Sequence, residues 1–398
     1  MKLSVVGPTY PFRGGISHYT SLLVRTLRSR YDVQFISYSR QYPAWLYPGN
    51  NDRDPSSSLL VHESPDREFD ALNPWAWGGI AHRIVEHESQ LVILPWSVFY
   101  WTPYYFLFLK ALRKVTEATA LFICHNVVEH ESSWLKSSVS KRVLKMGDVF
   151  ITHSQWDKAN LQRWIGDSRS DQIWVNPHPV YQHLCQQALL TKAEARERLG
   201  LRTERVLLFF GFIREYKGLR YLLESLPYIL KHYPVHLIIA GEVWEQKKIY
   251  NNLIRDLNLQ NNVTFAHHYI PNEEVESYFA AADLVVIPYT SATQSGVVQL
   301  AFGFGKPVVV GKVGGLMEVV EDQRNGYLVR PRDPRAIADA VLDFYDQNRE
   351  NEMIQNITSG LSRFSWQRMV ETIQKVMVQC RKDDSREDVI SSMDWSGR

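Results

Sequence analysis

Short, almost wholly apolar runs alternate with longer amphipathic stretches along most of this chain. The runs lie at residues 3–6, 33–37, 91–94, 120–124 and 149–153 in the first half, and at 206–211, 236–241, 263–265, 284–288 and 307–310 in the second. Near-continuous apolar strands separated by amphipathic helices are typical of parallel sheets that helices cover on both faces. The pattern therefore predicts an α/β fold with two doubly wound domains and a cleft between them.

The length of the chain and a polar stretch near its middle predict where the two domains meet. At about 150 residues per domain, 398 residues suggest two or three domains. The boundary is expected between residues 180 and 204, because 181–200 is polar and helix-like. A last helical stretch near 366–380 precedes a polar tail at 381–398, for which we expect disorder because it has little to bury.

Composition excludes several classes of protein. Apolar residues make up 45% of the chain and charged residues 22%, which is the balance of a globular protein and not of a disordered one. The net charge of +2 gives no support to nucleic-acid binding. Cys124, Cys185 and Cys380 are odd in number and widely spaced, so reduced thiols are expected and not a disulfide framework or a zinc site. The few apolar residues after Lys2 are too short a run for a secretory signal, which predicts a cytoplasmic protein.

One aromatic segment approaches the length of a membrane span. Pro95 and Pro103 interrupt residues 91–109, so the segment is interpreted as a buried strand that leads into an aromatic-rich helix. Basic residues follow at 110–114 and again at 136–145. They fit solvated helix faces, and they leave open a peripheral contact with a membrane surface, which for a cytoplasmic protein would be the inner face.

Candidate chemistry lies in loops that directly follow a predicted strand, where doubly wound sheets bind their ligands. The first loop holds Gly14 and Gly15, which permit close backbone approach before a helix whose N-terminus favours anions. An ordinary strand–helix turn would look the same. The loop matches neither a GxGxxG dinucleotide motif nor a P-loop, so a redox enzyme on a dinucleotide fold is disfavoured.

The second and third loops carry cations and a helix start. Arg214 and Lys217 follow the strand at 206–211, where both could point at one phosphate group. Residues 295–297 (Ser-Gly-Val) lie at an expected helix N-terminus, where free N–H groups favour an oxyanion. No DxD triplet at a strand end and no His/Cys/Asp cluster suggests a metal site. Asp283 is interpreted as a structural anchor for the strand that follows it.

Taken in order, several motifs resemble the donor-binding domain of retaining, family-4-type glycosyltransferases (glycosyl transferases group 1) with the GT-B fold. They are Gly211, Arg214, Lys217, Gly218, Gly241, Glu242, Asp283, Pro288, Ser295, Gly296, Val297, Gly305, Lys306, Pro307, Gly314, Gly315 and Glu318. The first half is similar to the acceptor domain through Gly14, Gly15, His125, His153 and Ser154.

The resemblance implies a domain plan and a reaction. Residues 1–185 would form an N-terminal acceptor-binding Rossmann-like domain and 186–365 a C-terminal domain that binds a nucleotide-sugar donor. Residues 366–380 would be a crossover helix that returns to the first domain. The implied enzyme is a hexosyltransferase of polysaccharide biosynthesis that moves a sugar from a UDP- or GDP-sugar to a glycan or lipid-linked hydroxyl, with retention. The donor is a cosubstrate, and neither a cofactor nor a metal is expected.

Site residues follow from the loops and from the resemblance together. Arg214 and Lys217 would neutralise the leaving diphosphate, and His125 would contact the transferred sugar. The leaving phosphate itself would accept the proton of the acceptor. Donor contacts are expected from Gly14, Gly15, Gln294, Ser295, Gly296, Val297, Gln299 and Glu318. The aromatic residues of 96–108 and of 42–77 are expected to shape the acceptor side.

The chain departs from the family pattern at three positions. Ala292 and Leu300 stand where two glutamates are usual, and Phe212 stands where an arginine is usual. Gln294 and Gln299 are candidates to replace the glutamates. The departures keep alternatives open: a nucleotide-sugar-binding protein that has lost catalysis, or an epimerase or phosphorylase on the same fold.

Overall fold

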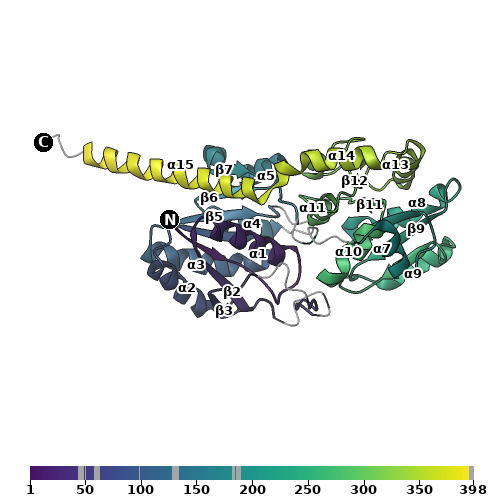
Figure 1. Ribbon diagram of the computed structural model, residues 1–398. Helices are drawn as coiled ribbons and strands as arrows, with labels where there is room; N and C mark the ends of the chain where they lie inside the picture. Colours follow the sequence, from purple (N-terminus) through teal and green to yellow (C-terminus); the bar gives the residue numbers. More distant parts are fainter. Residues whose placement is uncertain are drawn as a thin grey trace.

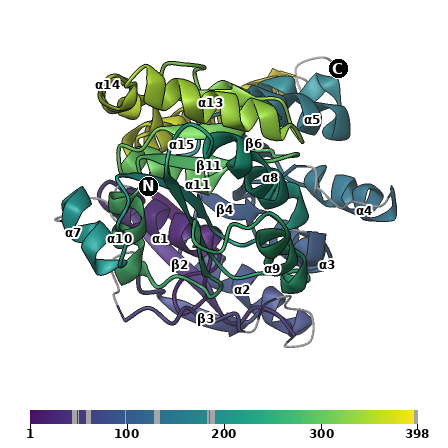
Figure 2. The same ribbon diagram turned by 90° about the vertical axis from the view of Figure 1, so that its right-hand side faces the viewer.

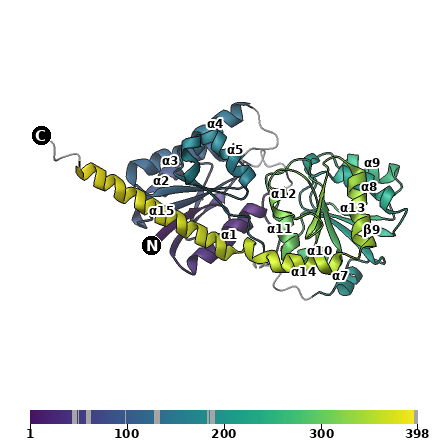
Figure 3. The ribbon, with the colours of Figure 1, turned by 90° about the horizontal axis from the view of Figure 1, so that it is seen from above.

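The computed structural model describes residues 1–43, 49, 51–57, 63–97, 99–127, 134–181, 184 and 190–393, except for the side chains of 134–136 and 381–393. Two lobes lie side by side, and each contains one parallel sheet (Figures 1 and 3). Cys185 and the predicted domain boundary at 185/186 fall outside the described residues. The sheets nevertheless divide the chain into a first domain, which ends after β7, and a second, which begins with α7.

The first domain is a seven-stranded parallel sheet with the strand order β3-β2-β1-β4-β5-β6-β7. Helices α1 and α15 lie on one of its faces, and α2 and α3 lie on the other (Figure 3). Its strands are β1 (Lys2–Val6), β2 (Asp32–Arg40), β3 (Arg67–Asp70), β4 (Leu91–Trp96), β5 (Thr119–Cys124), β6 (Val149–Thr152) and β7 (Ile173–Val175). Its helices are α1 (Gly15–Arg28), α2 (Pro74–Glu86), η1 (Phe99–Trp101), α3 (Thr102–Val115), α4 (Trp134–Leu144), α5 (Gln155–Ile165) and η2 (Asp167–Gln172).

The second domain is a six-stranded parallel sheet with the order β10-β9-β8-β11-β12-β13. Helices flank this sheet on both sides, as the view onto this lobe shows (Figure 2). Its strands are β8 (Arg205–Phe210), β9 (Val235–Ala240), β10 (Val263–Ala266), β11 (Leu284–Ile287), β12 (Val308–Gly311) and β13 (Gly326–Val329). Its helices are α7 (Lys192–Arg198), η3 (Glu215–Lys217), α8 (Leu219–Ile229), α9 (Lys247–Asp256), α10 (Asn272–Ala281), α11 (Gly296–Gly303), α12 (Leu316–Val319), α13 (Pro334–Asp346), α14 (Glu350–Gly360) and η4 (Leu361–Phe364).

A long C-terminal helix, α15 (Trp366–Met393), leaves the second lobe and runs along the first (Figure 1). Its start is tied to the first domain, because Trp366 Nε1 donates a hydrogen bond of 3.0 Å to the Val180 carbonyl and the Trp366 ring packs against Tyr19 of α1. The expectation of a disordered tail is wrong as far as Met393, because the helix continues through the polar stretch.

The strands match the predicted apolar runs because their side chains are buried on both faces. All six residues of β4 are buried, for example, and β8 pairs with β9 in register from Arg205 opposite Val235 to Phe210 opposite Ala240. The predicted strand-to-helix interpretation of 91–109 is confirmed by β4, η1 and α3. Within the described residues, none of the helices combines the length and hydropathy needed to cross a bilayer.

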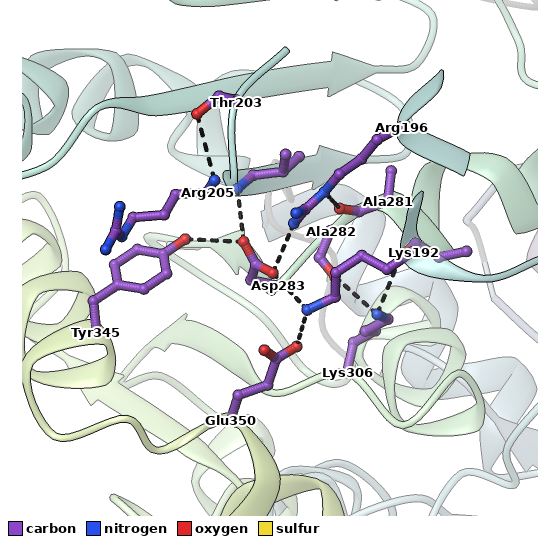
Figure 4. A network of polar contacts seen from close by, with 12 residues as sticks. Lys192, Arg196, Thr203, Arg205, Ala281, Ala282, Asp283, Lys306, Tyr345 and Glu350 are labelled. Carbon is purple, nitrogen blue, oxygen red and sulfur yellow. Dashed lines mark hydrogen bonds and ion pairs between the residues drawn. The ribbon is translucent and has the colours of Figure 1, made fainter. Parts of the chain in front are cut away.

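A network of charged residues lies at the amino ends of the strands of the second sheet, opposite their carboxyl ends (Figure 4). The buried Asp283 accepts hydrogen bonds from the Val206 N–H at 2.7 Å, from Lys192 at 2.7 Å and from Arg196 at 2.8 Å. The Asp283 carboxylate therefore ties β8, α7 and β11 together, which is the anchoring role expected of it. Beside it, burial lowers the pKa of Lys306 to about 8, and the ammonium donates to the Ala282 carbonyl at 2.8 Å.

Candidate active site

A cavity of about 1030 Å³ lies between the two domains, at the carboxyl ends of both sheets. The loops after β8, β9, β10 and β11 form its wall on the second domain, and the loops after β1, β2, β4 and β5 form most of its wall on the first. This is where doubly wound sheets bind ligands. The structure brings most of the predicted site residues to this wall: Gly14, Gly15, Arg214, Lys217, Gln294, Ser295, Gly296 and Val297.

Arg214 and Lys217 bring two positive charges to the cavity wall. Lys217 is buried, with its Nζ 5.3 Å from the centre of the Tyr289 ring, and the Arg214 guanidinium lies 5.2 Å from the centre of the Trp244 ring. Burial, reinforced by the charge of Arg214, lowers the pKa of the Lys217 ammonium. In the part of the chain that the structure describes, neither cation has an ion-pair partner. A bound anion would therefore supply the missing partner to both.

Two glycines allow the elements behind these cations to approach closely. Gly211 has a φ of 99°, and a Cβ there would lie 3.2 Å from Val297 Cγ2 and 3.4 Å from Lys217 Nζ. Gly218 has a φ of 75°, and a Cβ there would lie 2.2 Å from the carbonyl oxygen of Pro288. Only glycine tolerates both the backbone conformation and the lack of space. The glycines thus hold the loop after β8 against α11 and the end of β11.

The N-terminus of α11 lies on the same wall. Ser295 caps this helix, because its Oγ accepts a hydrogen bond of 3.3 Å from the Val298 N–H. The first N–H groups of a helix have no partner within it, and Gly296 and Val297 line the cavity. Next to them, the buried Oε1 of Gln294 has no hydrogen-bond partner among the described residues. This end of α11 therefore adds N–H donors and an amide to the two cations.

The wall on the first domain combines a glycine turn with aromatic side chains. Gly14 has a φ of 108°, and the Gly15 carbonyl accepts a hydrogen bond of 3.2 Å from the Tyr181 hydroxyl. Further along this wall, rings from the loops after β2 and β4 line the cavity: Tyr42, Phe99, Tyr100, Pro103 and Tyr104. The aromatic stretch singled out in the sequence thus reaches the cavity.

His125 does not line this cavity, although the resemblance implies that it contacts the transferred sugar. The side chain is fully buried, with its ring centre 4.4 Å from Tyr19 of α1 and 5.1 Å from His153. Burial, together with His153 and His178, lowers the pKa of the His125 imidazole, which is therefore neutral. Packing against α1 holds the ring beneath the wall, while the following residue, Asn126, lines the cavity.

Two predicted donor contacts also lie off the cavity wall. Gln299 is buried within α11, where its Oε1 has no partner among the described residues. Glu318 of α12 accepts hydrogen bonds from the backbone N–H groups of Gln155 at 2.7 Å and Trp156 at 2.9 Å. Its carboxylate thus occupies the N-terminus of α5, where the helix dipole favours a negative charge. In this structure Glu318 links the two domains.

The three departures from the family pattern all fall on the cavity wall. Ala292 and Leu300 line the cavity with apolar side chains where the resemblance expects glutamates. Phe212 also lines it, and its ring lies 4.2 Å from that of Trp244. The wall beside the two cations is therefore more apolar than the family pattern implies.

An ion pair between the domains was missed in the sequence. Arg13 Nη2 lies 2.7 Å from Glu242 Oε2, and only about 5% of either side chain is exposed. The Arg13 guanidinium also lies over the rings of Tyr269 and Phe212, at 5.2 and 5.8 Å from their centres. No local pattern connects residues so far apart in sequence, although Arg13 adjoins the Gly14 turn and Glu242 is one of the residues that carry the family resemblance.

In the described part of the chain, no group of three or more histidine, cysteine, aspartate or glutamate side chains is placed to hold a metal ion. The cavity wall offers a ligand cations, N–H donors, amides, hydroxyls and aromatic rings, together with His18 and the Glu242 carboxylate that is paired with Arg13.

The comparisons with known proteins agree with this geometry. Residues 204–347 match the family described as Glycosyl transferases group 1. This match lies within the second domain, which is therefore similar to a group 1 glycosyltransferase domain. An uncharacterized glycosyltransferase of Methanocaldococcus jannaschii is 31% identical over 180 residues, which are 44% of this chain and 45% of the relative. A D-inositol 3-phosphate glycosyltransferase of Corynebacterium urealyticum is 26% identical over 250 residues, 60% of this chain and 58% of the relative. The matches span about half the length of these curated relatives.

Solved structures show that the whole chain has the GT-B fold. The sucrose-phosphate synthase of Thermosynechococcus elongatus superimposes with a TM-score of 0.73 at 19% identity, covering 96% of this chain and 100% of that one. Anabaena HepE, solved in complex with UDP-glucose, gives a TM-score of 0.74 at 19% identity and covers 96% and 99% of the two chains. The predicted fold, two doubly wound domains facing a cleft, is confirmed.

Proposed function

We propose that this protein is a glycosyltransferase that moves a sugar from a nucleoside diphosphate sugar to a hydroxyl acceptor, with retention and without a metal ion. The observation that carries the proposal is the pair Arg214 and Lys217, two cavity cations without an ion-pair partner among the described residues, beside the N-terminus of α11. A diphosphate matches this arrangement in charge and in hydrogen-bonding capacity.

In the proposed reaction, the protein stabilises the charge that develops as the donor bond breaks. As the bond between the sugar C1 and the diphosphate oxygen breaks, negative charge grows on the leaving group and positive charge grows on the sugar ring. Lys217, Arg214 and the first N–H groups of α11 stabilise the leaving diphosphate. The acceptor oxygen attacks C1 from the same face, and its proton passes to the leaving phosphate. No side chain of the protein has to act as a base.

Metal independence is part of the proposal because these groups supply the charge neutralisation that a divalent cation otherwise gives. UDP-sugars are the first donors to test, since a structurally similar protein, HepE, was solved with UDP and with UDP-glucose. The acceptor is proposed to be a glycan or lipid-linked hydroxyl.

A thermal-shift panel of UDP-, GDP- and ADP-sugars, each with and without EDTA, tests the donor class. A ligand at about 100 times its Kd stabilises the folded protein by roughly 2.7 kcal/mol, which is readily measured. We expect a thermal shift with the sugars of one nucleotide base only, and we expect EDTA to leave that shift unchanged. Proton NMR of the anomeric centre of the product then tests retention.

One observation favours a second candidate, a nucleotide-sugar-binding protein without turnover. Ala292 and Leu300 place apolar groups on the cavity wall where the family pattern has glutamates. This candidate predicts a thermal shift with a donor but no release of nucleoside diphosphate in the presence of any acceptor. The absence of a shift with every nucleotide sugar would contradict both candidates.

We also propose a peripheral membrane contact through α3. Leu107, Lys110 and Lys114 are exposed on this helix, so an apolar residue lies beside two cations. Co-sedimentation with vesicles that contain anionic lipid is expected, and Leu107→Asp should weaken it. Equal sedimentation of wild type and variant would contradict the contact.

A further inference from the structure

We propose that the acceptor is an uncharged sugar, free or at the outer end of a larger glycan, that lies on a tyrosine platform formed by Tyr42, Tyr100 and Tyr104. The inference rests on the proposed function, because it assigns a substrate class to the half of the cavity that belongs to the first domain. It comes from the shape, rigidity and charge of that wall.

The three tyrosines bring aromatic rings and hydroxyl groups together on the cavity wall. The Tyr100 ring lies 5.3 Å from that of Tyr42 and 5.7 Å from that of Tyr104, and the hydroxyls of Tyr100 and Tyr104 lie 3.4 Å apart. All three side chains are half-buried and line the cavity. Rings with a polar edge suit a sugar, whose C–H faces pack on the rings while its hydroxyls hydrogen-bond at the rim.

Buried tryptophans hold the platform in place. Trp101 is 3% exposed, and its ring lies 5.4 Å from Tyr100, 5.8 Å from Tyr104 and 5.9 Å from Tyr42. Trp77, with no exposed surface, lies 6.2 Å from Tyr104. Because these rings are packed before a ligand arrives, binding costs little side-chain entropy.

The charge of this wall excludes a phosphorylated acceptor. Among the described residues of the first domain that line the cavity there is no lysine or arginine, and His18 Nε2 lies 3.6 Å from Asp54 Oδ2. The stretches outside the described residues between 44 and 133 and between 182 and 189 also contain no lysine or arginine. A phosphate enclosed here would lose water without gaining a cation.

Three cations lie near this half of the cavity or across from it, and none of them is available to the acceptor. Arg40 of β2 interacts with Tyr100 and Tyr104, but Asp70 holds its guanidinium through contacts of 3.1 and 2.5 Å. Arg214 and Lys217 belong to the second domain and neutralise the diphosphate of the donor in the proposed function. The acceptor half is thus polar and uncharged, unlike the phosphate named in the D-inositol 3-phosphate glycosyltransferases that this chain resembles.

Saturation-transfer NMR on the UDP-saturated protein tests the inference. The probes are the methyl α-glycosides of glucose, galactose and mannose, the 6-phosphates of the same sugars, and the matching octyl glycosides. We expect at least one methyl glycoside to bind about tenfold more tightly than its sugar 6-phosphate. Tyr104→Ala should weaken that binding about three- to tenfold, and Tyr104→Phe, which keeps the ring, should weaken it less.

Comparing methyl with octyl glycosides distinguishes a free glycan from a lipid-linked one. Equal binding of methyl and octyl glycosides indicates a free glycan, and tighter binding of the octyl compound, with the methyl glycoside still bound, indicates a lipid-linked one. Tighter binding of a sugar phosphate overturns the inference, as does binding of octyl glycosides alone or of no neutral glycoside. Failure of the wild-type protein to bind UDP or any other nucleotide would instead overturn the proposed function.

Controls keep a folding defect apart from a lost contact. Val85→Ala, at an exposed position of α2 away from the cavity wall, should leave glycoside binding unchanged. UDP affinity and the thermal midpoint report whether Tyr104→Ala is folded, and Tyr42→Ala, at the other end of the platform, gives a second variant. Unchanged glycoside binding in both folded variants overturns the assignment of the platform.

Discussion

Among single residues, Lys217 is expected to contribute most to turnover, because its buried ammonium has no ion-pair partner among the described residues before a donor binds. Removing one preorganised charge partner of a leaving group costs roughly a hundredfold in turnover or more. We expect Lys217→Ala to lower kcat by at least this factor in a coupled assay of nucleoside diphosphate release. Lys248→Ala, at an exposed position on α9, is the matched control. Equal kcat in the two variants would remove Lys217 from the mechanism.

Alanine substitutions at Gly200 and Gly218 distinguish the cost of backbone strain from the cost of a steric clash. Gly218 and Gly200 have φ values of 75° and 67°, but only at Gly218 would a Cβ meet another atom, the Pro288 oxygen at 2.2 Å. A left-handed non-glycine residue costs on the order of 1–3 kcal/mol. In urea unfolding, Gly200→Ala should lose about this free energy and Gly218→Ala distinctly more. Equal losses would show that the loop after β8 can move away from β11.

At the scale of elements, the N-terminus of α5 holds two carboxylates. The buried Asp157 accepts a hydrogen bond of 2.8 Å from Ser154, and Glu318 binds the first N–H groups of the helix. Burial, with a contribution from the Glu318 charge, raises the pKa of Asp157 from 3.8 to about 7. Between these two pH values the folded state keeps a proton that the unfolded state has lost, so stability falls as pH rises.

Asp157→Asn removes this titration and should flatten the pH dependence of the free energy of unfolding. The free energy of unfolding of wild type should fall relative to that of the variant from pH 5 to 8, by at most roughly 1.4 kcal/mol per pH unit. Urea unfolding at several pH values measures the difference. Two parallel curves would mean that Asp157 is already ionised in the folded protein at pH 5.

Strands and helices could be predicted from the sequence where their own residues show a clear apolar pattern. The interior strands β4 and β8 are buried on both faces and read as apolar runs. The edge strands β3, β7 and β13 were missed, whereas β10, an edge strand of four residues, was predicted from the apolar run at 263–265. Short length and pairing on one side weaken the sequence signal of a strand without removing it. The helical continuation of α15 past residue 380 was missed because its sequence shows no apolar face.

At the scale of the whole molecule, the buried pair Arg13–Glu242 joins the domains beside the cavity. Removing one partner of a buried pair costs about 3–5 kcal/mol, because the other charge stays buried. We expect Arg13→Glu and Glu242→Arg each to lower the thermal midpoint and to increase the radius of gyration in X-ray scattering. The double variant restores opposite charges and should recover part of both changes. Equal defects in the double variant would show that the pair does not hold the domains together.

The sequence by itself determined the two doubly wound domains, the cleft at their strand ends and part of the cavity wall, including Lys217 and the start of α11. These features are encoded locally, since apolar periodicity, glycine turns and helix starts each need only a few neighbouring residues. Only the tertiary structure decided that His125 lies beneath the wall, that Glu318 caps α5 and that Arg13 meets Glu242. Each of these depends on how segments distant in sequence pack, and packing decides which of several polar groups meets solvent, a partner or a ligand.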